Sequence, residues 1–338
     1  MLFLSVYELV LRVKGVVPFT PKLHSVKYEP EFIFSPSLKY GYTLKPGKYN
    51  FILPLLDSLV FKPTHSNDST RIAQPLDNIK NKSALAIFGA SYTYGFGVND
   101  STTFSWLLQK KCPDIDIINY GVPGYGPIHA YLKLKSLIAQ NTIPKAVILG
   151  YSFYHDNTNT LPRKSRETII RFSNILNKGF IENATAPYID AKQEGQIKVH
   201  YRPYDSFYTE WPLRRYSALV NYLENTYNNW DERRSESQKA SKKIISEIKR
   251  ICDKIHAPFI VAGISDHQET KEMLLYCKSQ DIQNVDISLN LNKNSIYRLH
   301  EKDGHPNAFA HRNYAKRLHA YLTNNKTTSE IIKKRDHL

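Results

Sequence analysis

The feature of this sequence that most restricts its fold is a regular alternation of short apolar runs with amphipathic segments, which begins near residue 84. Apolar runs of strand length lie at 84–88, 115–119 and 146–149. Segments with helical periodicity, 103–111 and 128–139, lie between them. Strands that alternate with helices in this way form a parallel, doubly wound sheet. We therefore predict an α/β domain.

The same alternation returns after residue 236. A helix is expected up to about residue 255, because Ile244, Ile248 and Ile251 share one helical face. Two more strands are then expected at 258–264 and 284–287, and two more helices at 269–279 and 307–322. Asn307 is expected to be the N-cap of the last helix. The complete pattern predicts a three-layer α/β/α sandwich around a five-stranded parallel sheet, which is a flavodoxin-like architecture.

Other parts of the chain lack this pattern. Residues 1–80 combine an apolar start with a segment rich in Pro, Tyr and Phe, which we interpret as a β-rich appendage. The α/β domain is assigned to 81–325, and 326–338 is read as a basic tail. Periodicity stops within the domain at 157–235, which we interpret as a long loop, either an insertion or a functional lid. Its aromatic residues either stack on sugar rings or pack on the body; they include Tyr201, Tyr204, Phe207, Tyr208 and Trp211.

The apolar start, residues 1–14, leaves three interpretations open. Glu8 and Arg12 interrupt it, and the run is shorter than the roughly 20 apolar residues of a membrane span. No small-residue cleavage site follows it, as a signal peptide would require. The segment is the stub of a membrane anchor, an interfacial helix or a helix packed on the body. We favour a membrane-associated or extracytoplasmic location over a cytoplasmic one.

The charge balance indicates which partners the surface would attract. The chain has 46 Lys and Arg against 31 Asp and Glu, a formal net charge of +15, which attracts polyanions. The basic residues are scattered and accompany no nucleic-acid-binding motif, so we expect no nucleic-acid partner. An anionic membrane and an acidic polysaccharide both remain candidate partners. The three cysteines lie far apart, which excludes a disulfide framework and a cysteine zinc cluster.

Polar segments follow four of the expected strands, where ligands of an open parallel sheet bind. They are Gly89-Ala90-Ser91, the run Asn119 to Gly126 that contains Gly124, His155-Asp156 and Asp303-Gly304-His305. Each has a plainer interpretation: Ser91 as a helix N-cap, His305 as the start of the last helix, and His155 as a satisfied surface histidine. Together they predict one shared site, since the carboxyl ends of parallel strands meet at one edge.

In this order the four segments resemble the blocks of the SGNH (GDSL-type) hydrolase superfamily. The resemblance implies Ser91 as nucleophile, His305 as base and Asp303 as its partner, with an oxyanion hole from Ser91, Gly124 and His155. Such groups belong together because a serine hydroxyl is a weak nucleophile until an oriented imidazole accepts its proton. The developing oxyanion then needs hydrogen-bond donors.

This sequence departs from the family pattern at three positions. Ala90 replaces the acidic residue beside the nucleophile, and His155 replaces an amide donor. The Asp303-Gly304-His305 spacing is one residue shorter than the family's Asp-x-x-His, so Asp156 is an alternative partner for the base.

The resemblance implies a serine-dependent esterase or O-acyltransferase acting on a small-molecule or carbohydrate ester, or on a lipid. The alternative is a catalytically inactive SGNH-fold binding or assembly protein, and a membrane-associated form of that protein is included in this alternative. No cofactor is expected: Gly95-Phe96-Gly97 lacks the third glycine of a dinucleotide fingerprint. No metal is expected either, because His305 and His311 are six residues apart, not the four that align two ligands on a helix.

Overall fold

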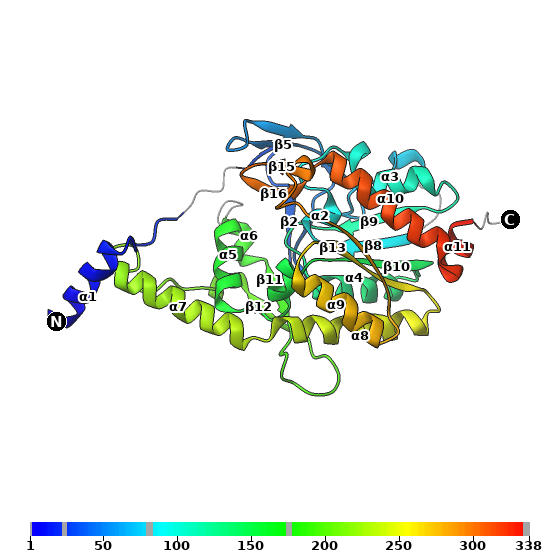
Figure 1. Ribbon diagram of the computed structural model, residues 1–338. Helices are drawn as coiled ribbons and strands as arrows, with labels where there is room; N and C mark the ends of the chain where they lie inside the picture. The colour runs from blue at the N-terminus through cyan, green and yellow to red at the C-terminus, as the bar shows by residue number, and fades with distance from the viewer. Residues whose placement is uncertain (1, 22–25, 79–83, 174–177, 334–338) are drawn as a thin grey trace.

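The computed structural model describes residues 2–21, 26–78, 84–173 and 178–333. Its centre is a five-stranded sheet in the order β14-β13-β10-β8-β9, and every neighbouring pair is parallel. In chain order the strands are β8 (Leu85–Gly89), β9 (Ile117–Gly121), β10 (Ala146–Tyr151), β13 (Phe259–Ser265) and β14 (Gln283–Leu289). The α/β fold class and the five-stranded parallel sheet predicted from the sequence are confirmed (Figure 1).

Alternate residues of each central strand face opposite layers of helices, as the strand period of two requires. On β8, Ala86 and Phe88 join one apolar core while Leu85 and Ile87 join the other. The first core includes residues of α4 (Pro127–Ala139), α8 (Ser237–Lys254) and α9 (Gln268–Ser279). The second includes residues of α3 (Phe104–Lys111), α10 (Ala308–Asn324) and α11 (Lys326–Lys333). The expected N-cap is confirmed, because the Asn307 side chain accepts hydrogen bonds from the first turn of α10.

Helix α11 occupies most of the segment that we interpreted as a basic tail. It packs its buried Ile332 into the core beneath α10, and the buried Thr328 hydroxyl donates to the Leu322 carbonyl at 2.8 Å. Residues 326–333 are therefore part of the folded body rather than a free tail, and residues 334–338 lie outside the described part. The expected boundary at 80/81 also lies outside it.

The segment before the sheet consists of short strands, as expected. They pair as β1 (Lys27–Glu29), β5 (Asn50–Leu53) and β6 (Leu59–Phe61); β2 (Phe34–Ser37) and β3 (Gly41–Leu44); and β4 (Gly47–Lys48) and β7 (Thr64–His65). A third apolar core joins Phe51 of this segment to Tyr94 and Val122 near the carboxyl ends of β8 and β9, and to Phe207 of the later insertion. The appendage thus packs over the edge of the sheet where ligands bind.

Our interpretation of 157–235 as a long loop was wrong for most of its length. After a 3-10 helix (Phe153–Asn159), this region contains α5 (Arg163–Ser173), α6 (Lys178–Glu182), β11 (Thr185–Tyr188), β12 (His200–Pro203) and α7 (Ala218–Arg234). The hydrophobic pattern of the sequence did not reveal helix α7, because two of the three residues that it buries are polar. The three are Ala218, Glu224 and Asn228. Among the aromatic residues proposed for sugar stacking, Tyr204 and Phe207 are buried in the third core, so for these two the packing interpretation holds.

The polar face of α7 is held by ion pairs with α5 and the loop before α7. The buried Arg214 guanidinium lies 2.6 Å from Glu167 and 3.2 Å from Glu224, and Glu224 also lies 2.5 Å from Arg163. Buried charges stay stable only when they are paired and hydrogen-bonded, and these are. The insertion is therefore a folded unit with a charged interior.

The apolar start forms helix α1 (Leu2–Val13), which Figure 1 shows projecting from the body beside the start of α7. The Glu8 carboxylate accepts hydrogen bonds from the Ala218 and Leu219 N–H groups at 2.9 and 2.7 Å. Partial burial alone would raise the pKa of Glu8, but these N–H groups outweigh it and lower the pKa to about 2. Leu11 is buried, whereas Phe3, Leu4, Leu9 and Val13 are exposed. Across the described residues, the structure has no helix of the length and apolarity needed to cross a membrane.

Candidate active site

Ser91 stands on a tight turn between β8 and the short helix α2 (Ser91–Tyr94). Gly89 makes this turn with a φ of +156°, and a Cβ there would lie 2.8 Å from the Gly150 carbonyl oxygen. Glycine is required because any side chain would collide with the neighbouring strand. The Asn119 side chain donates to the Thr93 carbonyl at 2.8 Å and so holds α2 against β9. The turn that carries Ser91 is therefore fixed from two sides.

His305 reaches Ser91 from a distant part of the chain. It lies on strand β16 (Asp303–Pro306), which pairs with β15 (Arg298–His300) after the last strand of the central sheet. Its Nε2 atom is 3.0 Å from Ser91 Oγ, and its Nδ1 atom is 2.7 Å from Asp303 Oδ1. The structure thus brings the three predicted residues into one hydrogen-bonded chain.

The carboxyl group of Asp303 is held in its charged form. Burial would raise its pKa, but the hydrogen bonds and the charge of His305 outweigh this effect, and the pKa falls below its ordinary value. An ionised carboxylate accepts the Nδ1–H of the imidazole, which leaves Nε2 as an acceptor for the serine proton. The arrangement suits an imidazole that acts as a general base.

Two aromatic rings that we did not single out from the sequence enclose His305. The ring centre of Phe96 lies 4.6 Å from that of His305, and the ring centre of Tyr92 lies 5.6 Å away. The Tyr92 hydroxyl donates to the Gly304 carbonyl at 2.9 Å, so α2 and β16 are joined directly. The sequence offered one indication that these rings belong to the site, because both residues lie within five positions of Ser91. Only the fold shows that they contact His305.

His155 and Asp156 have different surroundings although they are adjacent. His155 lines the same hollow as Ser91 and His305, and burial together with the charge of His305 lowers its pKa to about 4. It is therefore neutral near pH 7 and can donate one N–H. Asp156 instead accepts hydrogen bonds from the Tyr151 and Ser241 hydroxyls at 2.8 and 2.5 Å, and burial raises its pKa to about 7. These contacts hold Asp156 in the core, so Asp303, not Asp156, partners the imidazole.

Gly124 lies in the loop after β9 with a φ of +83°, a left-handed conformation that favours glycine. A Cβ at this position would collide with the Tyr42 hydroxyl, which donates to the Pro123 carbonyl at 2.7 Å. Among the described residues, no hydrogen-bond partner is found for the Gly124 N–H. Gly124 is not among the residues that line the hollow beside Ser91.

The hollow beside Ser91 has about 870 Å³ of space and is open to solvent. Its other lining residues mix apolar, aromatic and polar side chains: Tyr92, Tyr154, Ser265, Asp266, Leu289, Leu291, Asn292 and Gly304. Within the described ranges, no cluster of three or more His, Cys, Asp or Glu side chains could hold a metal ion. A mixed lining of this kind is typical of a site for a small organic molecule.

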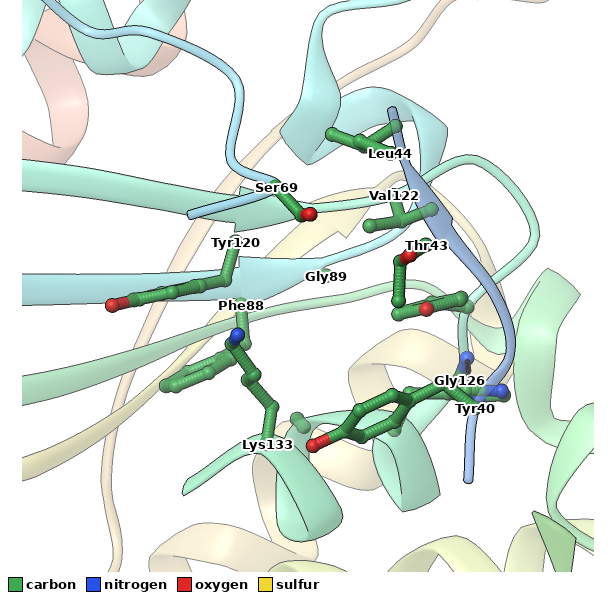
Figure 2. A pocket seen from close by; sticks show the side chains of 13 residues that line it. Tyr40, Thr43, Leu44, Ser69, Phe88, Gly89, Tyr120, Val122, Gly126 and Lys133 are labelled. Carbon is green, nitrogen blue, oxygen red and sulfur yellow. Dashed lines mark hydrogen bonds between the residues drawn. The ribbon is translucent and has the colours of Figure 1, made fainter. Parts of the chain in front are cut away.

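A separate hollow of about 440 Å³ lies near the carboxyl ends of β8 and β9, on the side of α4. Figure 2 shows Tyr40, Phe88, Tyr120 and Lys133 around it, and the Lys133 ammonium lies 5.3 Å from the centre of the Tyr120 ring. Gly89 lines this hollow, but neither Ser91 nor His305 does. The reactive groups therefore belong to the hollow beside Ser91.

Three solved structures resemble this chain. A lipolytic protein of the G-D-S-L family from Desulfitobacterium hafniense is 12% identical, and the match covers 71% of this chain and 99% of that one with a TM-score of 0.38. A member of the same family from Veillonella parvula is 11% identical, with coverage of 72% and 99% and a TM-score of 0.40. A GDSL-like lipase from Bacteroides thetaiotaomicron is 11% identical, with coverage of 74% and 91% and a TM-score of 0.37. All three are lipolytic or lipase-like proteins of the GDSL type.

No family model matches the chain, and no curated protein matches it.

Proposed function

We propose that this protein is a serine hydrolase that cleaves esters through an acyl-serine intermediate. The observation that supports this most directly is the Ser91–His305–Asp303 chain, with distances of 3.0 Å and 2.7 Å, beside an open hollow. A nucleophile within hydrogen-bond reach of a base that a third group orients is the arrangement required for nucleophilic catalysis by serine.

In this mechanism, Ser91 Oγ attacks the ester carbonyl carbon while His305 Nε2 takes the hydroxyl proton. The tetrahedral intermediate collapses, the bond to the alcohol oxygen breaks, and His305 returns the proton to that oxygen. Water, or the hydroxyl of an acceptor sugar, then attacks the acyl-serine with the same proton transfers and frees Ser91. Asp303 stabilises the imidazolium that forms in each half of the reaction. It also holds the neutral imidazole in the tautomer that leaves Nε2 free to accept a proton.

The oxyanion of each tetrahedral intermediate needs donors aimed at it. We assign this role to the Ser91 N–H, the Gly124 N–H and the imidazole of His155. The lowered pKa of His155 supports the assignment, because the neutral ring donates one N–H without adding a second buried charge beside His305.

The substrate class follows from the resemblance and the lining of the hollow. We propose an acylated carbohydrate or lipid, since Leu289, Leu291 and Tyr154 offer apolar surface to an acyl chain while Asp266 and Asn292 offer polar groups to its alcohol part.

Labelling with a fluorophosphonate, read by intact mass, tests the proposal. We expect one adduct, mapped to Ser91, and no adduct on Ser91→Ala. Ser152→Ala is the matched control, because the Ser152 hydroxyl is also buried near the sheet edge but has no hydrogen-bond partner among the described residues. A folded protein that takes up no label would support the alternative, an inactive SGNH-fold binding protein.

A further inference from the structure

The insertion contains a hollow of its own, with about 1070 Å³ of space open to solvent. It lies between α5, β11, β12 and the end of α7, which Figure 1 shows grouped on the side of the molecule away from α11. The residues that matter for its chemistry are Arg166, Tyr188, Asp190, Lys192, His200, Arg202, Asp231 and Arg234. None of the residues proposed for catalysis lines it.

Positive charge dominates this hollow. Four cations, Arg166, Lys192, Arg202 and Arg234, face two carboxylates. Both carboxylates are already engaged by backbone groups: Asp231 accepts the Arg163 N–H at 2.6 Å, and Asp190 accepts the Lys192 N–H at 2.8 Å. The positive charge of the guanidinium groups is therefore only partly neutralised by these carboxylates.

The Arg166 side chain is only 18% exposed. Its Nη2 atom lies 4.0 Å from Asp231, and its buried Nε has no hydrogen-bond partner among the described residues. Burial, followed by the charge of Arg202, lowers its pKa below the ordinary value. A buried donor without a partner is costly.

Arg202 and Arg234 have guanidinium groups that are available for a ligand. Arg202 lies 5.8 Å from the centre of the Tyr188 ring, and Arg234 lies 5.1 Å from that of Trp230. In the part of the chain that the structure describes, neither forms an ion pair or a hydrogen bond through its side chain. The planar fork of arginine matches a phosphate, sulfate or carboxylate with two parallel hydrogen bonds.

We propose that this hollow is a binding site for a ligand that carries an oxyanion group, held by Arg166, Arg202 and Arg234. The space is much larger than a bare ion needs, and Tyr188 offers an aromatic face beside the cations. We therefore expect an acidic oligosaccharide to bind more tightly than an inorganic ion. The site is separate from the proposed catalytic residues, so the inference stands whether or not the protein hydrolyses esters.

Isothermal titration calorimetry on the full chain tests the proposal with four probes: inorganic phosphate, inorganic sulfate, an oligomer of glucuronic acid and the same oligomer reduced to its neutral form. Arg202→Gln and Arg166→Gln should each raise the Kd of the anionic probes about tenfold or more, since each removes a charged hydrogen bond. Arg233→Gln is the matched control, because Arg233 is exposed on the same helix as Arg234 but does not line the hollow.

The outcomes are distinct. Binding of the acidic oligomer or of an inorganic anion that weakens in the two variants and with added salt, but not in Arg233→Gln, supports the site. Tighter binding of the oligomer than of the inorganic anions identifies a saccharide as the source of the oxyanion, and the reverse identifies a free ion. Equal binding of the neutral oligomer, no binding of any anion, or equal affinities in Arg202→Gln and the control would overturn the proposal. Circular dichroism shows whether Arg166→Gln has folded, and Arg202→Gln keeps the test valid if it has not.

Discussion

Asp303 and His305 stand two residues apart on strand β16, and one carboxylate oxygen of Asp303 accepts both the backbone N–H and the Nδ1–H of His305, each at 2.7 Å. In an extended strand, residues i and i+2 point to the same side. The spacing that looked too short in the sequence is therefore compatible with contact, because this segment is a strand rather than a helical turn.

This geometry gives Asp303 and Asp156 different expected roles in catalysis. We predict that Asp303→Asn lowers kcat for a short-chain aryl ester by on the order of 10⁴-fold, because an amide in that place favours the wrong imidazole tautomer. Asp156→Asn should retain most activity, since Asp156 bonds to Tyr151 and Ser241 in the core. Kinetics on both purified variants check this; a crippled Asp156→Asn beside an unaffected Asp303→Asn would reverse the assignment.

Ser91→Ala and His305→Ala should each lower kcat by on the order of 10⁴- to 10⁶-fold, and the double variant should lose little more. Groups that act as one unit show such non-additive losses. Ser91 is only 7% exposed, yet removing its hydroxyl leaves the turn intact, since that turn depends on Gly89 and Asn119. Substantial turnover by a Ser91→Ala protein with native circular dichroism would refute the nucleophile.

His155 can be tested by two substitutions. His155→Asn supplies an amide N–H and should keep most activity, whereas His155→Ala should lose about a hundred- to a thousandfold in kcat, as removal of one oxyanion donor does elsewhere. KM should change less than kcat in both. If wild type and both variants have equal kcat, His155 plays no part in the reaction.

Stability should fall on mild acidification because several histidines are held neutral by burial. Burial lowers the pKa of His65, His129 and His311 from the ordinary 6.5 to about 3 each. Between about pH 6.5 and pH 3 the unfolded chain binds more protons than the folded chain, so the free energy of unfolding decreases as pH falls through this range. Each histidine contributes up to about 1.4 kcal/mol per pH unit.

Asp156 opposes this trend, because its pKa is raised from 3.8 to about 7 and its contribution to stability is lost as pH rises through that interval. It is one group against four histidines, because burial also lowers the pKa of His155 to about 4. Urea unfolding at about pH 7 and about pH 5 measures the balance, and we expect a lower free energy of unfolding at the lower pH. An equal or higher value at about pH 5 would contradict the prediction.

Helix α1 gives a prediction about membranes. It is docked through Glu8 and Leu11 but exposes Phe3, Leu4 and Leu9. We propose that this surface contacts anionic lipid, so deletion of residues 1–14 should weaken sedimentation with phosphatidylserine vesicles and leave ester hydrolysis unchanged. Glu8→Gln, which disturbs the docking but keeps the apolar residues, is the control and should still bind vesicles. Unchanged partitioning after the deletion would make α1 a packing helix only.

The sequence by itself determined the layered α/β fold and the segments that meet at its edge. The strands and helices of the sheet bury apolar residues at periods of 2 and 3.6, and hydrophobic patterning registers that burial directly. The same logic predicts that Ser91 and His305 lie at one edge, because the segments that follow parallel strands share that edge.

Only the tertiary structure decided which acid partners His305, how the appendage covers the edge of the sheet, and that the insertion is helical. Helix α7 buries Glu224 against Arg214 and Arg163, so its inward face is charged and leaves no apolar period to detect. Arg214 meets Glu167 from 47 residues away. Whether a charged residue faces water or a buried partner depends on long-range contacts, and local sequence patterns do not contain them.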